Sequence, residues 1–395
     1  MTGLFYTSDD KPGFTRVKGA KHFRYRDTKG NWIKDADEIA RINKLAIPPA
    51  YADVWICPSR NGHLQATGKD ARGRKQYRYH PDWQLQRNDN KFGRLQSFGQ
   101  ALPRIRARIA RDLTPKRNQP ISRTVVLATL VRLLDTTFVR VGNDEYARDN
   151  GSYGLTTLRN PHAGVRGATL RLKFRGKSGV MQDLQLNDPK VATVVRRCQQ
   201  LPGQLLFQYE DYDGEVHGVG SGDVNDYIAE IVEGISARHE AVSSQAGAAE
   251  LASPGRRRSA PSGGRELREA SERGGQHFTA KDFRTWHGTV QALELTRLAC
   301  NGPEPDNYSA KTIVAEVARQ LGNTPAVCKK SYIHPAVMAL ATDLAADASA
   351  MSGIWDALEK GSKPARRMRA AEARLLVFLK AQQRLARKRT KSQKA

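Results

Sequence analysis

The pattern of hydrophobic and polar residues divides the chain into two parts. Over residues 1–84, short runs of strand-forming residues are separated by turn signals. WICPS at residues 55–59 and HLQATG at residues 63–68 flank an Asn-Gly pair, which strongly favours a hairpin turn. A second short turn leads into RKQYRYH at residues 74–80, in which side chains alternate between two faces. The first part of the chain is therefore predicted to be β-rich.

From Lys91 onward, apolar residues recur at spacings of three and four, which is the period of an amphipathic helix. The first predicted helix continues to Leu113. A second begins at Ser122, a favourable N-cap residue, and brings Arg140 close to its C-terminal end. A cation at that place can simply complement the helix dipole, or it can belong to a functional site.

A strand pattern interrupts the helices between residues 170 and 186. Leu170, Leu172 and Phe174 alternate with basic residues, and GKSG turns the chain before a returning strand. Lys177 is thereby predicted to lie at an exposed hairpin tip, where a lysine is ordinarily a solvated surface residue with no specific role. Two short strands are predicted at LLFQYED and EVHGV, and helical patterns begin near residues 188, 222, 279 and 309.

These patterns predict an α+β protein with two domains. Residues 1–84 form a small β-rich N-terminal domain, and residues 85–395 form a larger, mainly α-helical domain that contains a β-hairpin or short sheet. Residues 236–275 are rich in Ser, Ala, Gly, Pro and Arg and poor in large apolar side chains, so they are predicted to be a disordered insertion. The chain ends in a basic tail, ARKRTKSQKA, which is typical of solvated charge.

Charge narrows the choice of partner. The formal net charge is +25 and the isoelectric point is about 10.1, which favours a polyanion, with nucleic acid first and an anionic membrane surface second. No apolar run approaches the roughly 18 to 20 residues needed to span a bilayer, and the N-terminus lacks the pattern of a signal peptide. The four cysteines form no C-x-x-C pair, so neither a disulfide framework nor a zinc site is indicated. We expect a cytoplasmic protein that binds no membrane.

The segment LGNTPAVCKKSYIHP at residues 321–335 carries the strongest chemical signal. It places Tyr332 at the end of a predicted short helix among lysines, and nearby cations favour the phenolate of a tyrosine. Gly322 suits a helix end, and Asn323 or Thr324 before a proline suits the start of the next helix. Tyr332 is therefore a candidate nucleophile, the alternative being an ordinary half-buried tyrosine. Cys328, four residues earlier, is predicted to be a packing residue.

This segment resembles the active-site tyrosine box of the type IB DNA topoisomerases of the bacterial and poxvirus-like branch, in which the pattern is T-P-x-x-x-K-x-x-Y. Three more stretches match the same family in the same order: TFVRVGNDEYA around Arg140, LKFRGKSG around Lys177 and KDFRTWHGT around Arg284. The resemblance covers residues 12–345 apart from the insertion. It implies a catalytic domain like that of the tyrosine recombinases.

The resemblance also implies a mechanism. Tyr332 is implied as the nucleophile, Arg140 and Arg284 as ligands of the non-bridging phosphate oxygens, Asn323 as a further donor and Lys177 as the general acid. Supercoiled DNA would be relaxed through a 3′-phosphotyrosyl intermediate, strand swivelling and religation, with neither ATP, a metal nor any other cofactor. Poxvirus members have histidine where this chain has Asn323, so only hydrogen-bond donation is expected there.

The run DARGRKQYRYH resembles the N-terminal DNA-clamp domain of the same family. Cations suit phosphates, while glutamine and tyrosine suit base edges or the backbone, so this strand is predicted to face DNA. The alternative is a solvated basic edge strand. The candidate DNA-binding residues are Arg72, Arg74, Lys75, Gln76, Tyr77 and Tyr79.

Other functions fit the sequence less well. A tyrosine site-specific recombinase would carry histidine three residues before the second arginine, where this chain has Lys281. A basic DNA-binding protein without activity would have no need for the four motifs in this order. His287 shares a helical face with Arg284 and is expected to be only a neighbour of the site. We expect a nucleoid-associated monomer that clamps double-stranded DNA.

Overall fold

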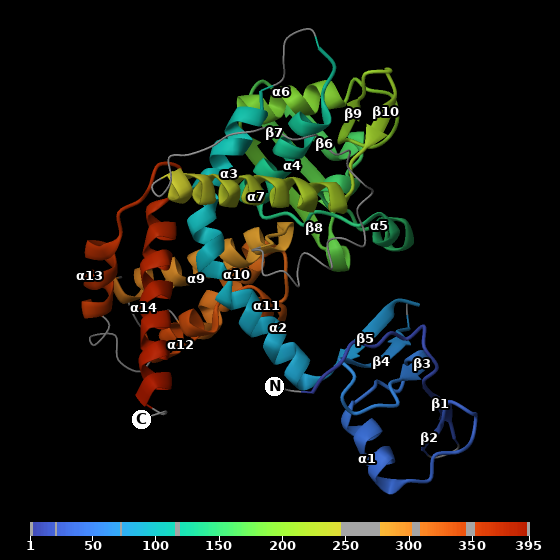
Figure 1. Ribbon diagram of the computed structural model, residues 1–395. Helices are drawn as coiled ribbons and strands as arrows, with labels where there is room; N and C mark the ends of the chain where they lie inside the picture. The colour runs from blue at the N-terminus through green and yellow to red at the C-terminus, as the bar shows by residue number, and fades with distance from the viewer. Residues whose placement is uncertain are drawn as a thin grey trace. The chain divides into compact units, whose positions relative to one another are not determined.

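The computed structural model describes residues 3–19, 22–71, 73–114, 119–245, 277–301, 309–344 and 352–392 (Figure 1). The chain forms two compact units, Met1–Gly93 and Arg94–Ala395. The boundary drawn from the sequence, between residues 84 and 85, falls inside helix α2 (Pro81–Gly93). This helix starts before the helical period becomes visible at Lys91, because Pro81 suits a first helical position and Asp82 suits the first turn.

The N-terminal unit contains an antiparallel five-stranded sheet in the order β2-β1-β3-β4-β5. As the Asn-Gly signal predicted, β3 and β4 are antiparallel neighbours. The strands are β1 (Phe14–Lys18), β2 (Phe23–Arg26), β3 (Ala52–Ile56), β4 (Leu64–Lys69) and β5 (Lys75–Tyr79).

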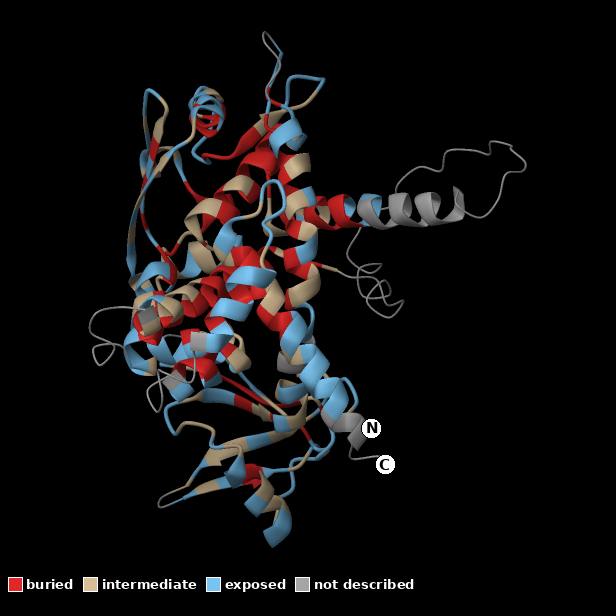
Figure 2. Cartoon of the chain, turned by 90° about the vertical axis from the view of Figure 1, so that its left-hand side faces the viewer, coloured by how far each residue is buried: buried red, intermediate tan, exposed pale blue. Residues whose placement is uncertain are grey.

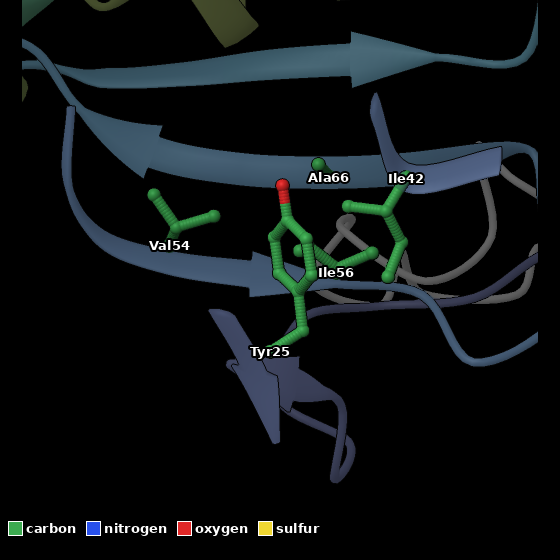
Figure 3. Close-up of a cluster of buried hydrophobic side chains, with 5 residues drawn as sticks. All are labelled: Tyr25, Ile42, Val54, Ile56 and Ala66. Atoms are coloured by element: carbon green, nitrogen blue, oxygen red, sulfur yellow. The ribbon is translucent and has the colours of Figure 1, made fainter. Parts of the chain in front are cut away.

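Helix α1 (Ala36–Lys44) closes the core of this unit. Its N-cap is Asp35, whose carboxylate accepts a hydrogen bond from the Asp37 N–H. Ile42 of the helix is buried against residues of three strands, β2, β3 and β4 (Figure 3), and together they form the core: Tyr25, Ile42, Val54, Ile56 and Ala66. The Tyr25 hydroxyl donates to Asn43 Oδ1 at 2.9 Å, so the buried phenol is satisfied.

The larger unit is mainly helical. Its helices are α3 (Leu95–Asp112), α4 (Arg123–Thr137), α5 (Asp144–Asn150), α6 (Pro189–Cys198), α7 (Ser221–Gln245), α9 (Ala280–Asn301), α10 (Ala310–Leu321), α11 (Pro325–Ser331), α12 (Pro335–Leu344), α13 (Ser352–Gly361) and α14 (Ala370–Ser392). An antiparallel sheet has the order β6-β7-β8, from β6 (Ala163–Arg166), β7 (Thr169–Arg175) and β8 (Met181–Asn187). A separate hairpin pairs β9 (Gln208–Glu210) with β10 (Val216–Gly218). Together with the N-terminal sheet, this gives the predicted α+β class.

Two helices form the centre of the larger unit. Helix α4 is apolar around most of its circumference and packs against α3, α6, α7 and α9. Helix α9 is buried along most of its first half, from Asp282 to Val290. Figure 2 shows buried residues concentrated in the interior helices of this unit and exposed residues on the outer ones. A helix that is apolar on most sides is stable only when other elements surround it, so the packing around α4 and around the first half of α9 holds these segments in place.

Helix α7 differs from the sequence prediction at its C-terminal end. It continues to Gln245, whereas residues 236–275 were predicted to be disordered. Ala237, Glu240, Ala241 and Gln245 in the first part of that stretch are good helix formers, and it contains no glycine or proline. The rest of the predicted insertion, residues 246–275, lies outside the described residues.

Candidate active site

One pocket of the larger unit, with a volume of about 360 Å³, brings together the side chains that the motifs singled out. Arg140, Lys177, Arg284 and Tyr332 line it. Asn323, the fifth candidate, is hydrogen-bonded to Arg140. These five residues come from four separate parts of the chain, and the fold brings them together.

Arg140 lies three residues beyond Thr137, the last residue of α4. The C-cap residue Phe138 has a left-handed backbone conformation with φ 60° and turns the chain. The Arg140 carbonyl then accepts a hydrogen bond from the Leu155 N–H at 2.9 Å. Its guanidinium group donates to the side-chain oxygen of Asn323. Leu155 therefore holds the backbone of Arg140, and Asn323 holds its side chain.

Arg284 lies in the second turn of α9. The helix starts near residue 279, as predicted, with a capping arrangement: the Asp282 carboxylate accepts hydrogen bonds from the Thr279 N–H at 2.8 Å and hydroxyl at 3.0 Å. The buried Arg284 guanidinium donates to the carbonyl oxygens of Phe138 and Leu321, the latter at 2.7 Å. Burial, and then the nearby charge of Arg140, lower the pKa of Arg284 below its ordinary value.

Tyr332 follows α11 directly and is 9% exposed. The centre of the Arg284 guanidinium lies 5.0 Å from the centroid of the phenol ring. Burial by itself would raise the pKa of Tyr332, but the charges of Arg284 and Arg140 and a hydrogen bond from Arg284 outweigh it. The pKa of Tyr332 is lowered, which favours the phenolate over the phenol relative to a tyrosine in water.

The turn between α10 and α11 has the predicted caps. Gly322 ends α10 with φ 57°, a left-handed conformation that favours glycine. Thr324 is the N-cap of α11, where its hydroxyl accepts a hydrogen bond from the Val327 N–H at 3.4 Å. A Cβ on Gly322 would lie 2.7 Å from the side-chain nitrogen of Gln182 in β8, so the sheet abuts this turn.

Two hydrogen-bond donors at the site have no partner among the described residues. Arg284 Nε and Asn323 Nδ2 are both buried and make no hydrogen bond within the part of the chain that the structure describes. Unpaired buried donors are rare, and each has a free-energy cost of about 1–3 kcal/mol. Each therefore has hydrogen-bonding capacity that no described residue uses.

Lys177 is exposed at the hairpin tip between β7 and β8, as predicted. Its Nζ lies 5.8 Å from the centroid of the Tyr146 ring. The tip is a tight turn in which Ser178 has φ 65°. The ammonium group of Lys177 thus extends on a long side chain from a small turn at the edge of the pocket.

Sequence reasoning missed three contributions to this site. Lys281 lines the pocket and helps to lower the pKa of Tyr332; its place one helical turn before Arg284 was a usable signal. Tyr146 lines the pocket beneath Lys177. The Thr289 hydroxyl shares its proton between the Thr285 carbonyl at 2.8 Å and the Tyr332 carbonyl at 3.1 Å, and it accepts a hydrogen bond from the His334 N–H at 3.1 Å. No local pattern indicates that last role.

Two neighbours of the site are excluded from direct chemistry. Cys328 is fully buried, and burial raises the pKa of its thiol to about 11, so it is a protonated packing residue, as predicted. His287 is 4% exposed, and its side chain bonds to Asp135 rather than lining the pocket.

The candidate DNA-binding strand β5 lies at an edge of the N-terminal sheet. Two of the candidate cations have acidic partners: Lys75 pairs with Asp9 at 2.6 Å, and Arg74, just before the strand, pairs with Asp70 at 2.7 Å. The other candidates that the structure describes are placed as follows: Gln76 donates to Asp70 at 3.0 Å, and Tyr77 stacks on Tyr79 with centroids 6.1 Å apart. Arg72 lies outside the described residues. A polyanion would have to replace Asp9 and Asp70 at these cations.

Within the described part of the chain, no cluster of three or more His, Cys, Asp or Glu side chains is arranged to hold a metal ion. None of the helices described is long and apolar enough to cross a membrane.

Comparison with known proteins agrees with the motifs. Residues 22–70 match the family model "Bacterial DNA topoisomerase IB, N-terminal domain", and residues 74–239 match "Eukaryotic DNA topoisomerase I, catalytic core". The chain is 29% identical over 333 residues to the DNA topoisomerase 1B of Acanthamoeba polyphaga mimivirus, an alignment that covers 81% of this chain and 85% of the relative. It is 24% identical over 148 residues to the DNA topoisomerase 1 of Mycosarcoma maydis, which covers 33% of this chain and 14% of that protein. Arg140 and Lys177 fall inside the matched catalytic core, whereas Arg284, Asn323 and Tyr332 come after it.

Proposed function

This chain belongs to the type IB DNA topoisomerases, and we propose that it relaxes supercoiled DNA by cutting one strand through a 3′-phosphotyrosyl intermediate at Tyr332, letting that strand swivel and then resealing it. The observation that carries the proposal is that Tyr332, Arg284, Arg140 and Lys177 line one pocket, in which the two guanidinium charges lower the pKa of Tyr332. A phenol in water, with a pKa of about 10, is a poor nucleophile at neutral pH. These two cations are the groups that favour its phenolate.

In the cleavage step, the Tyr332 oxygen attacks the phosphorus and the bond from phosphorus to the DNA 5′ oxygen breaks. Negative charge grows on the phosphate oxygens during this step, so fixed donors aimed at them lower the barrier. Arg140 and Arg284 suit the two non-bridging oxygens because a guanidinium is a planar fork of donors. The unpartnered Arg284 Nε and Asn323 Nδ2 support this role, since Arg284 lines the pocket and Asn323 is hydrogen-bonded to Arg140, which also lines it.

The departing 5′ oxygen needs a proton, and Lys177 is the proposed donor. Its exposure at the tip of the β7–β8 turn lets the ammonium group approach a bound strand. A positioned general acid contributes roughly 10² to 10⁴ in rate. In religation the 5′-hydroxyl attacks the phosphotyrosine, returns its proton to Lys177 and releases Tyr332. The phosphodiester is exchanged for another ester of similar energy, so the proposed cycle consumes no nucleotide.

The substrate of the family is DNA, and we propose that β5 contributes to binding the duplex. Lys75 and Arg74 would exchange Asp9 and Asp70 for phosphates, while Gln76, Tyr77 and Tyr79 would contact base edges or the backbone. Such an exchange of ion pairs is favourable at low ionic strength, because binding releases counterions from DNA. In this proposal a single copy of the protein binds the duplex.

The test is relaxation of a supercoiled plasmid in EDTA without ATP, with detergent trapping of the covalent adduct. The wild-type protein should relax the plasmid and leave protein attached to a 3′ end, whereas Tyr332→Phe should do neither. Tyr212→Phe is the matched control, because Tyr212 is fully exposed and distant in sequence from every motif. Relaxation that persists in Tyr332→Phe, or that requires magnesium, would overturn the mechanism.

A further inference from the structure

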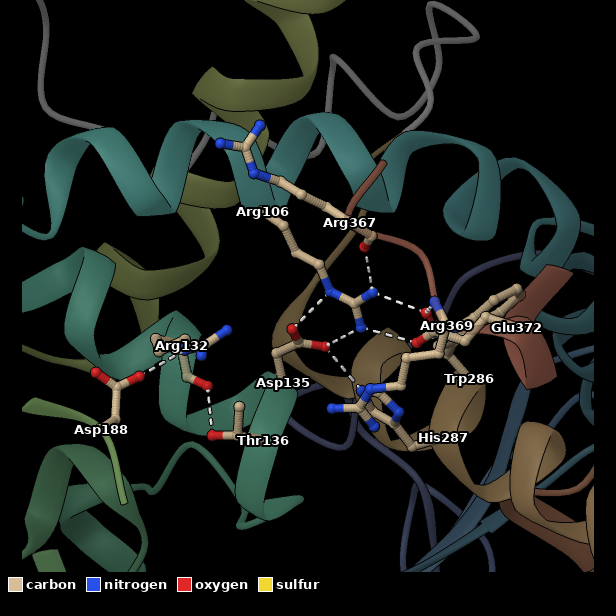
Figure 4. Close-up of polar contacts among 10 residues, drawn as sticks. All are labelled: Arg106, Arg132, Asp135, Thr136, Asp188, Trp286, His287, Arg367, Arg369 and Glu372. Atoms are coloured by element: carbon tan, nitrogen blue, oxygen red, sulfur yellow. Dashed lines mark hydrogen bonds and ion pairs between the residues drawn. The ribbon is translucent and has the colours of Figure 1, made fainter. Parts of the chain in front are cut away.

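Behind the pocket, a buried ionic network joins α3, α4, α9 and α14 (Figure 4). Arg106 of α3 pairs with Asp135 of α4 at 2.8 Å and with Glu372 of α14 at 2.7 Å. Each of these two carboxylates accepts two hydrogen bonds from Arg106. A fifth goes to the Arg367 carbonyl at 2.8 Å, so all five N–H donors of Arg106 are used. Removing one partner of such a group leaves an uncompensated buried charge, so these four elements are fixed relative to one another.

His287 of α9 is attached to this network through Asp135. Its Nε2 lies 2.9 Å from Asp135 Oδ1. Hydrogen bonds and the charges of His287 and Arg106 outweigh burial and lower the pKa of Asp135, so the carboxylate is ionised and can only accept. The imidazole therefore donates from Nε2. On its other side, the ring packs against the Phe138 ring with centroids 4.6 Å apart.

Phe138 is the residue on which both arginines depend. Its carbonyl oxygen accepts a hydrogen bond from Arg284, and its left-handed conformation directs the chain towards Arg140 two residues later. His287 lies one helical turn after Arg284 and touches this residue from behind. Asp135, His287, Phe138 and Arg284 thus form a continuous series of contacts from the buried network to the pocket.

We propose that His287 is a positioning residue that keeps the α4 turn and Arg284 in register, and that the network anchors it through Asp135. The proposal rests on the proposed function, because it concerns the rate of strand cleavage. His287 touches no reacting atom, so it acts through Phe138 and Arg284. Glu372 extends the same anchor to α14, which lies outside both matched family models.

The role divides into a hydrogen bond and a packing contact, which three variants separate. His287→Ala removes both, His287→Phe keeps a ring against Phe138 but loses the hydrogen bond, and His287→Gln keeps a donor that can reach Asp135. Loss of an outer partner of a metal-ligating residue typically costs about 10- to 100-fold in activity, and we take the same range for an outer partner of Arg284. We expect His287→Ala and His287→Phe to slow covalent adduct formation by about that factor under single-turnover conditions. His287→Gln should stay within about threefold of wild type.

Controls separate positioning from general stability. DNA affinity should change by less than about twofold in all three variants, since His287 is buried and does not line the pocket. Arg132→Gln is the matched control, because it breaks a 3.0 Å pair with Asp188 on the outside of the same helix α4 and should leave the cleavage rate within twofold of wild type. Thermal melting of each variant shows whether it is folded.

A double-mutant cycle with Arg284→Lys is decisive. If His287 acts through Arg284, His287→Phe should slow cleavage by less than about threefold in the Arg284→Lys background, because coupled residues are not additive. A full 10- to 100-fold loss in that background, or a wild-type rate in His287→Phe alone, would overturn the positioning role. Absence of any adduct from the wild-type protein would instead refute the proposed function, so the two failures are distinguishable.

Discussion

The contact between α9 and the end of α11 offers the sharpest test of how Tyr332 is placed. Gly288 of α9 faces the backbone of Tyr332. A Cβ added there would lie 2.9 Å from the Tyr332 carbonyl oxygen, 3.1 Å from Leu321 Cδ1 and 3.3 Å from Tyr332 Cβ. The adjacent Thr289 hydroxyl holds the same carbonyl at 3.1 Å. Gly288→Ala therefore presses on a nucleophile whose backbone cannot retreat without losing a hydrogen bond.

The size of the effect follows from these distances. Ordinary contact begins at 3.4 Å, so the Tyr332 backbone or α9 must move by about 0.5 Å. Overpacking of this kind costs roughly 1–3 kcal/mol, and the better helix propensity of alanine offsets about 0.8–1 kcal/mol of it. We expect a net destabilisation of about 0–2 kcal/mol. Because a 1 Å misplacement can cost roughly 10²-fold in rate, we expect cleavage to slow by about tenfold.

The assay is single-turnover formation of the covalent adduct, measured beside thermal unfolding. Gly234→Ala is the matched control, because Gly234 is an exposed glycine inside α7 at which an added Cβ meets no described atom within 4 Å. The control should be as stable as wild type or slightly more so, and should cleave at the same rate. If Gly288→Ala also cleaves at the wild-type rate and gains stability, the close approach of α9 does not control the position of Tyr332.

Three further predictions concern charge and reactivity. Asp9→Asn frees Lys75 from its 2.6 Å pair, so affinity for duplex DNA at low salt should rise about two- to fivefold and the gain should fade at high salt; weaker binding in a filter or anisotropy assay would contradict the assigned role of β5. Lys281→Gln removes one of the charges that lower the pKa of Tyr332, so the rise of the cleavage rate with pH should move to higher pH, and a move to lower pH would contradict the attribution. Cys328→Ala should cost about 1 kcal/mol of stability and leave adduct formation within about threefold of wild type, whereas loss of the adduct would implicate the thiol.

Local patterns predicted much of the site because several of its parts are built locally. The alternation of Leu170, Leu172 and Phe174 with basic residues is the burial pattern of β7, and it put Lys177 at the following turn. The start of α9 at Thr279 and the glycine that ends α10 were likewise visible as caps. Each of these features depends on residues within four or five positions of one another, which is the range over which sequence patterns act.

The contacts that hold the site together could not be predicted in this way. His287 and Asp135 are 152 residues apart in the chain, and Arg106 and Glu372 are 266 apart. No periodicity links such pairs, so His287 was taken only as a neighbour of the site. The start of α2 at Pro81 was missed for a different reason, since its first turns are polar and show no apolar period.

The repulsion between the two arginines of the site is offset by the C-terminal ends of two helices. Arg140 and Arg284 repel each other, and the pKa of Arg284 is lowered by burial and by that repulsion. The carbonyl oxygens that Arg284 binds belong to Phe138 and Leu321, at the C-terminal ends of α4 and α10. These ends carry partial negative charge, which favours a cation within the last turn. The fold thus holds two like charges together without a carboxylate in the pocket lining, so that a DNA phosphate, when bound, supplies the full negative charge that the pocket lacks.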